Sequence, residues 1–213
     1  MNIGIAGRLT RAFIQSPLTP LFLLAALAAR QQAVCVAGMH GKTTTAALLA
    51  FALGELGARP SYAVGALVPQ LEPHAQFTVE RDAGSTLFAL ETDESDGTHL
   101  ELPLYGTIIT NIETDHLDHY GSFDGIVDSF DTYLAQIPGP KIVNADDDVT
   151  RRLGAKCGAI TFGLGSDADV RAVDIEASDG SFTFEVERRS ASGLDRLGAI
   201  HLPMRGIYNV RNA

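Results

Sequence analysis

The chain has 213 residues, of which 46% are hydrophobic, and this composition predicts one domain with a sizeable core rather than two full-sized domains. Its formal net charge of -10 argues against a nucleic-acid or anionic-membrane partner, since both require a basic surface. Cys35 in an expected strand and Cys157 in an expected loop form neither a zinc motif nor a disulfide framework, so we expect a reducing compartment.

The first 30 residues predict a lead-in followed by a linker helix. Arg8 and Arg11 precede the apolar run 21–29, which is also the pattern of a secretory signal peptide. That run has about half the length needed to cross a bilayer, and a glycine-rich loop follows within a few residues. We therefore favour a buried helix over a signal peptide and expect no membrane-spanning segment.

Short apolar runs rich in branched residues then alternate with helix-like stretches. This pattern predicts an α/β fold with a mostly parallel sheet flanked by helices. The expected strands cover residues 33–37, 86–90, 107–111, 141–144 and 159–162. The expected helices cover residues 43–56, which Gly57 would end, and 124–136, where the apolar residues share one face.

The pattern changes near residue 169. "DVRAVDIEASDGSFTFEVERR" predicts two alternating strands that meet at Asp179-Gly180, and "AIHLPM" predicts a third strand. We therefore expect a small antiparallel sheet near the C-terminus. The final "YNVRNA" has the composition of the opening of a helix.

The stretch "VCVAGMHGKTTTA" places a glycine-rich turn between an expected strand and an expected helix. Such a turn presents backbone N-H groups and the positive end of the helix to an anion. Gly38, Gly41 and Lys42 supply the turn and a mobile positive charge, and Thr43 is placed to bind magnesium through its hydroxyl. The spacing matches GxxGKT, with Val36 where the longer phosphate-loop motif has its first glycine.

Two acidic segments follow other expected strands. Glu91 ends a strand in "ALETDESDGTHLEL", and Asn111 and His116 follow a strand in "IITNIETDHLDHYGSF". Ligands of open α/β sheets bind at the carboxyl ends of the strands, so we expect magnesium chemistry at these two positions. The acidic residues at 146–148 and at 124, 128 and 131 are better interpreted as a solvated acidic face.

The segments "GMHGKTTTA", "ETDESD", "TNIETDHLDHYGSF" and "GIYNVRNA" resemble, in order and spacing, the Mur ligases of peptidoglycan synthesis. The resemblance covers roughly residues 20–213 and favours the alanine-adding branch of the family. Members have three domains, for the UDP-sugar, for ATP and for the amino acid. The resemblance implies that residues 31–213 are the central ATP-binding domain, truncated at its C-terminal end, without the UDP-binding and C-terminal ligase domains.

The resemblance also implies an activity and a set of site residues. The activity is a cytoplasmic, ATP-dependent and magnesium-dependent ligase that joins L-alanine to UDP-N-acetylmuramate through an acyl phosphate, for which this chain alone would be nearly inactive. The implied catalytic residues are Lys42, Glu91 and His116, and the implied magnesium ligands are Thr43, Glu91 and His116. The implied ATP contacts are Gly38, His40, Gly41, Lys42, Thr43, Thr44, Asn209 and Asn212, and the muramyl substrate would lie near Asn111 and His116.

Several alternatives stay open. Within the superfamily they are the tripeptide-recycling ligase, the D-glutamate-adding ligase and folylpolyglutamate synthase. From another class, the chain could be a nucleotide-binding module without turnover. A generic phosphate-loop kinase or transporter ATPase is a weaker third hypothesis, because such a protein would not need the pair Glu91 and His116.

Overall fold

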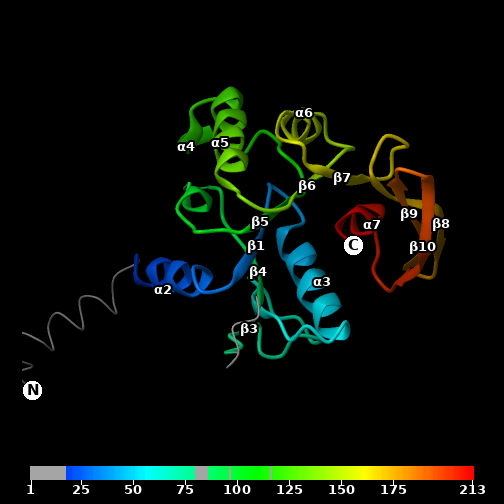
Figure 1. Ribbon diagram of the computed structural model, residues 1–213, viewed down its shortest axis with the longest axis horizontal. Helices are drawn as coiled ribbons and strands as arrows, with labels where there is room; N and C mark the ends of the chain where they lie inside the picture. Colours follow the sequence, from blue (N-terminus) through cyan, green and yellow to red (C-terminus); the bar gives the residue numbers. More distant parts are fainter. Residues whose placement is uncertain (1–17, 80–85, 96, 116) are drawn as a thin grey trace, which may run out of the picture.

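The computed structural model describes residues 18–79, 86–95, 97–115 and 117–213, and within them the strands form one ten-stranded sheet (Figure 1). The strand order is β10-β9-β8-β7-β6-β5-β1-β4-β2-β3. The strands are β1 (Gln32–Ala37), β2 (Ser61–Ala63), β3 (Ala75–Gln76), β4 (Leu87–Glu91), β5 (Gly106–Ile109), β6 (Lys141–Asn144), β7 (Ile160–Gly163), β8 (Val170–Ser178), β9 (Ser181–Ser190) and β10 (Gly193–Leu202). The expected α/β fold is confirmed.

Helices cover both faces of the parallel part of the sheet. They are α2 (Leu18–Ala28), α3 (Lys42–Glu55), α4 (Leu117–Tyr120), α5 (Phe123–Gln136), α6 (Asp148–Cys157) and α7 (Ile207–Asn212), with a short 3-10 helix at Thr98–Leu100. The helix α3 packs on one face, against β1 and β4, whereas α2, α5 and α6 contribute to the core on the other face (Figure 1). None of the helices in the described ranges is long and apolar enough to cross a membrane.

The strand β1 lies at the centre of the parallel sheet. It pairs with β4 on one side and with β5 on the other, both in parallel. Its neighbours Cys35 and Val36 are both fully buried but face opposite layers, because Cys35 packs with α5 and α2 and Val36 packs with α3. Because both faces of β1 are buried, its sequence is a continuous apolar run and does not alternate between apolar and polar residues.

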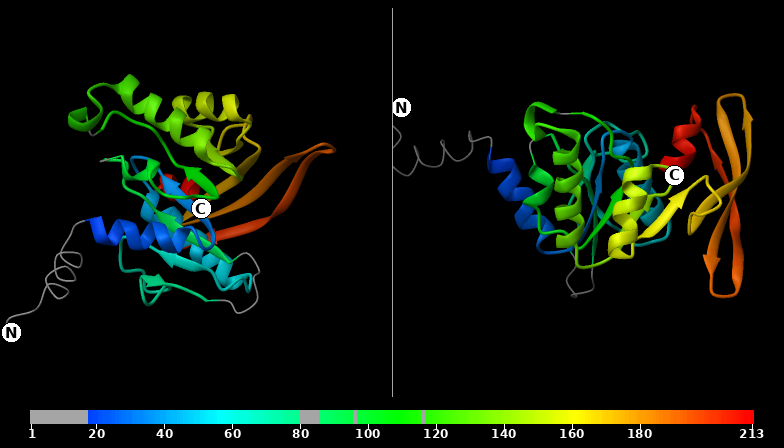
Figure 2. Two further views of the ribbon diagram at one scale, coloured as in Figure 1. Left: turned by 60° about the vertical axis from the view of Figure 1, so that its left-hand side comes forward. Right: turned by 90° about the horizontal axis from the view of Figure 1, so that it is seen from above.

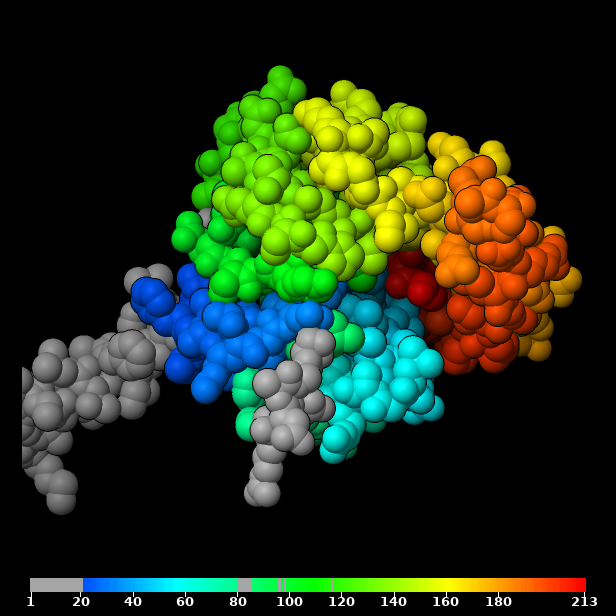
Figure 3. Space-filling model, in the orientation of Figure 1, coloured from blue at the N-terminus to red at the C-terminus, as the bar shows by residue number. Residues whose placement is uncertain are grey.

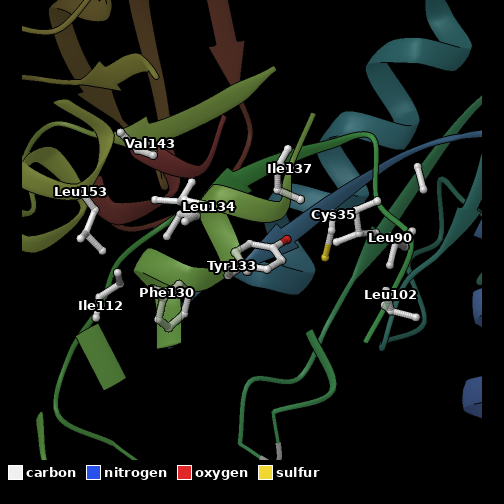
Figure 4. Close-up of a cluster of buried hydrophobic side chains, with 14 of the residues drawn as sticks. Cys35, Leu90, Leu102, Ile112, Phe130, Tyr133, Leu134, Ile137, Val143 and Leu153 are labelled. Carbon is white, nitrogen blue, oxygen red and sulfur yellow. The ribbon is translucent and has the colours of Figure 1, made fainter. Parts of the chain in front are cut away.

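The main core lies between the sheet and α5. Phe130, Tyr133 and Leu134 of α5 are almost fully buried there, next to Cys35 of β1 (Figure 4). The Tyr133 hydroxyl lies 2.9 Å from Thr107 Oγ1, and the Thr107 hydroxyl donates to the carbonyl oxygen of Cys35 at 3.0 Å. These buried polar groups are therefore satisfied, as a close-packed core requires.

The C-terminal strands form the expected antiparallel unit. Strands β8 and β9 meet at Asp179 and Gly180, which have φ of 41° and 82°, the left-handed values that a tight two-residue hairpin turn requires. The unit projects from the body of the domain (Figure 2). Strand β8 pairs with β7 of the parallel sheet through Phe162 with Val170 and Gly163 with Arg171.

Three details differ from the sequence-based expectation. Cys157, which we expected in a loop, is the last residue of α6, and Gly158 ends that helix with φ of 67°. Asp147, which we expected on a solvated acidic face, instead caps the start of α6. Its carboxylate accepts the backbone N-H groups of Val149 and Thr150. The short strands β2 and β3 were not expected, because two or three residues are too few to show a periodic pattern.

Candidate functional site

The glycine-rich turn connects β1 to α3 at the carboxyl end of the sheet. Gly38 has φ of 122° and Gly41, immediately before the helix, has φ of 86°. A side chain at Gly38 would lie 2.7 Å from the carbonyl oxygen of Asn111, and one at Gly41 would lie 2.5 Å from Asn212 Oδ1. Both positions therefore require glycine for two reasons, the backbone conformation and the close neighbours.

The loop is held in place by the end of the neighbouring strand β5. The Asn111 amide accepts the N-H of His40 at 2.9 Å and donates to the carbonyl oxygen of His40 at 2.8 Å. Thr110 Oγ1 donates to the same carbonyl oxygen at 2.6 Å. The side chain of Asn111, expected near the substrate, is thus used to fix the conformation of the loop.

Lys42 opens α3 and turns back over the loop. Its ammonium group donates to the carbonyl oxygen of Gly38 and to Glu94 Oε1, both at 2.8 Å. The Lys42 side chain is 20% exposed, whereas Glu94 is fully buried. Glu94 lies in the acidic segment after β4, and its pairing with Lys42 was not anticipated from the sequence.

Glu91, the last residue of β4, is brought next to the loop by strand pairing. It lies opposite Val36 in the register of β4 with β1, two residues before Gly38. Its Oε2 atom is buried and has no hydrogen-bond partner among the described residues. The backbone of Gly65 also packs against this carboxylate so closely that a side chain there would collide with it. Glu91 is therefore held at the end of β4, beside the strand that leads into the loop, with one carboxylate oxygen uncompensated.

The helix α7 brings the C-terminal motif to the other side of the loop. Asn212 packs against Gly41 and donates to Asn209 Oδ1 at 3.2 Å, and Asn209 donates to the carbonyl oxygen of Arg205 at 2.7 Å. Asn209 is 7% exposed. In the space-filling view α7 lies recessed between α3 and the β7 end of the sheet (Figure 3). The expected site residue His116 lies outside the described residues.

A cavity of about 600 Å³ lies between the loop and α7. It runs along the carboxyl ends of β1, β5, β6 and β7, where an open parallel sheet binds its ligands. Its lining includes His40, Gly41 and Thr44 of the predicted site. The same lining contains Phe162, Tyr208 and Asp146, which were not predicted as site residues.

Asp146 links the end of β6 to the loop after β7 and to α7 at the edge of this cavity. Its carboxylate accepts the backbone N-H groups of Leu164 and Gly165 and the Arg211 guanidinium, at 2.9–3.0 Å. Burial raises the pKa of the Asp146 carboxyl, but these donors outweigh it, so that the pKa lies below its ordinary value. Asp146 is thus not part of a solvated acidic face as we expected. Its position just after an expected strand was the available signal.

The fold and the loop together define a phosphate-loop α/β domain. Residues 36–213 match the family model of the Mur ligase middle domain, and the chain belongs to this family. The chain is 36% identical over 198 residues to UDP-N-acetylmuramate--L-alanine ligase of Hyphomonas neptunium. That match covers 90% of this chain but 41% of the relative, so the chain spans less than half the length of the curated relative.

Two solved structures share the fold. The UDP-N-acetylmuramate-alanine ligase MurC of Thermotoga maritima superposes with a TM-score of 0.73 at 25% identity, covering 97% of this chain and 46% of that one. The UDP-N-acetylmuramate:L-alanyl-gamma-D-glutamyl-meso-diaminopimelate ligase of Neisseria meningitides gives a TM-score of 0.76 at 21% identity. That match covers 99% of this chain and 68% of that one, and at this identity it supports the fold alone.

Proposed function

We propose that the chain is the ATP-binding unit of an ATP-dependent amide ligase that joins L-alanine to UDP-N-acetylmuramate. The observation that carries this proposal is the glycine-rich loop, whose residues His40, Gly41 and Thr44 line a cavity of about 600 Å³. Lys42 turns back over the same loop, and Glu91 ends the strand paired with β1, with one carboxylate oxygen uncompensated. Cavities of this size suit a small-molecule ligand or cofactor. The name and the 36% identity of the Hyphomonas neptunium relative favour the alanine-adding reaction.

In this proposal the chain positions the reactants and neutralises charge. The carboxylate of the muramyl substrate attacks the γ-phosphate of ATP, which releases ADP and leaves an acyl phosphate. The amino group of alanine then displaces phosphate and loses a proton, which forms the amide. Lys42 contacts the outer phosphates, and the N-H groups of the turn from Gly38 to Thr44 surround them. No covalent bond to the protein is needed.

The residues at the end of β4 fit magnesium. Glu91 Oε2 is buried without a hydrogen-bond partner among the described residues, and an oxygen ligand in that condition suits a hard cation. We propose that Glu91 and Thr43 hold one magnesium ion and that His116 contributes to a second. Bound magnesium neutralises charge on the phosphate oxygens. Without it, the acidic residues of this region would repel ATP.

The cavity accounts for the remaining proposed contacts. Asn209 and Asn212 lie on the α7 side, where we place the adenine end of ATP, and His40 lies at the tip of the loop. The Asn111 amide fixes the conformation of the loop through its hydrogen bonds to His40. We place the substrate carboxylate beside Asn111. A nucleotide-binding module without turnover remains the second candidate, because the Lys42 and Glu91 arrangement supports binding by itself.

The test is phosphate release from magnesium-ATP by the complete gene product. We expect release with UDP-N-acetylmuramate plus L-alanine, but not with UDP-N-acetylmuramoyl-L-alanine plus D-glutamate or with UDP-N-acetylmuramate plus the tripeptide. Release with only one of the latter two pairs would assign a sister ligase. ATP binding without release for any pair would favour the non-catalytic module, and a Glu91→Ala variant that keeps magnesium-dependent turnover would contradict the proposed metal site.

A further inference from the structure

We propose that Glu94 is a positioning residue for Lys42: its buried carboxylate fixes the lysine in the loop and competes with nucleotide phosphate for the lysine's charge. This inference rests on the proposed ATP site. It adds a residue to which neither the sequence motifs nor the family resemblance gave a role.

The geometry shows how firmly the lysine is held. Lys42 Nζ has three protons to donate, and two of them are directed to Glu94 Oε1 and the carbonyl oxygen of Gly38. One donor therefore remains for a phosphate oxygen while the lysine stays in place. The segment that carries Glu94 is itself tied to α4, because the Tyr120 hydroxyl donates to the backbone carbonyl oxygen of Glu94.

The burial of Glu94 makes the pair interdependent. Its side chain is fully buried, and its Oε2 atom has no hydrogen-bond partner within the described part of the chain. Among these residues, Lys42 is the cation in contact with it. Removing one partner of a buried ion pair leaves the other charge uncompensated, which is strongly unfavourable. Without the Glu94 charge, the Lys42 ammonium would therefore gain more from a phosphate anion than it does in the wild type.

If Glu94 competes with phosphate for Lys42, removing its charge should lower the Kd for ATP, whereas loss of a merely structural residue would raise it. Glu94→Gln keeps a hydrogen-bond acceptor of the same size but removes the negative charge. We expect the Kd of the chain for ATP to fall about tenfold, because phosphate replaces the missing counter-charge. The Kd for AMP should stay unchanged, since AMP lacks the β- and γ-phosphates that Lys42 contacts. A variant that only disturbed the loop would weaken ATP binding.

Titration calorimetry with ATP and with AMP at fixed magnesium tests the inference, in the wild type, Glu94→Gln, Lys42→Met and the double variant. In the Lys42→Met background, Glu94→Gln should leave the Kd for ATP unchanged. Asp131→Asn provides a charge control, because Asp131 forms an exposed ion pair with Lys156 outside the cavity lining. We expect Asp131→Asn to alter the Kd for ATP by less than about twofold.

An unchanged or raised Kd for ATP in Glu94→Gln would overturn the inference, and so would a tightening that persists without Lys42. If Glu94→Gln does not fold, Glu94→Asp provides the test, because the shorter side chain withdraws the carboxylate from Lys42. It should tighten ATP binding less, and again without affecting AMP. A wild-type chain that does not bind ATP would instead refute the proposed ATP site itself, so the two failures are distinguishable.

Discussion

Replacing Gly38 with alanine tests the close fit of the loop against β5. The new Cβ would lie 2.7 Å from the carbonyl oxygen of Asn111 and would also collide with Thr110 Oγ1, and neither β5 nor its end can withdraw without breaking strand pairing. Overpacking of this kind costs about 1–3 kcal/mol. The positive φ of 122° adds about 1–2 kcal/mol for a residue with a side chain. The free energy of unfolding should therefore fall by about 2–5 kcal/mol.

Gly57→Ala provides the matched control. Gly57 also has a positive φ, 80°, but a Cβ there would have no heavy atom within 4 Å. This variant should lose only the conformational part, about 1–2 kcal/mol. Urea unfolding followed by circular dichroism measures both losses. Equal losses in the two variants would refute the claim that contact with β5, rather than backbone conformation, decides the residue at Gly38.

Three further predictions concern stability and reactivity. Asn111→Ala removes both hydrogen bonds to His40 and should lower the free energy of unfolding by about 1–2 kcal/mol, whereas Asn111→Asp keeps the acceptor and should lower it less. Equal losses of stability in urea unfolding would contradict this prediction. Asp146→Asn should destabilise the chain at pH 7 by about 1–2 kcal/mol. The folded pKa of Asp146 lies below its ordinary value of 3.8, so the difference in free energy of unfolding between wild type and variant should shrink as the pH falls below 3.8. A difference that does not change with pH would contradict this prediction. Burial raises the pKa of the Cys35 thiol to about 12, so a thiol reagent at pH 8 should modify Cys157 alone in the folded chain and both cysteines in denaturant. Fast labelling of Cys35 in the folded chain would contradict this prediction.

The sequence predicted the parallel strands well because each is a short, continuous apolar run followed by polar residues. Strand 141–144 was predicted with its observed bounds, and the other four expected strands of the parallel sheet were displaced by one or two residues at their ends, whereas the short parallel strand β2 was missed. The Asp179-Gly180 turn was equally predictable, because a two-residue hairpin turn restricts the residue type at both positions. Local patterns of this kind need no knowledge of tertiary contacts.

The sequence predicted the surroundings of the candidate site only where strand ends defined them. Gly38, Gly41 and Glu91 were identified because each follows or ends an expected strand. The pairing of Lys42 with Glu94 could not be predicted, since it joins residues 52 positions apart and depends on β4 lying beside β1. The partners of Asp146 come from the loop after β7 and from α7, and no sequence periodicity indicates that these segments converge.

The central position of β1 has a consequence for synthesis of the chain. Its residues Gln32–Ala37 leave the ribosome before either neighbour exists, because β4 begins at Leu87 and β5 ends at Ile109. At translation rates of about 5–20 residues per second, the 72 residues from 37 to 109 take roughly 4–14 s. Until β4 is made both edges of this apolar strand are open, and one edge stays open until β5 follows, so the nascent chain exposes an unpaired strand edge during this interval.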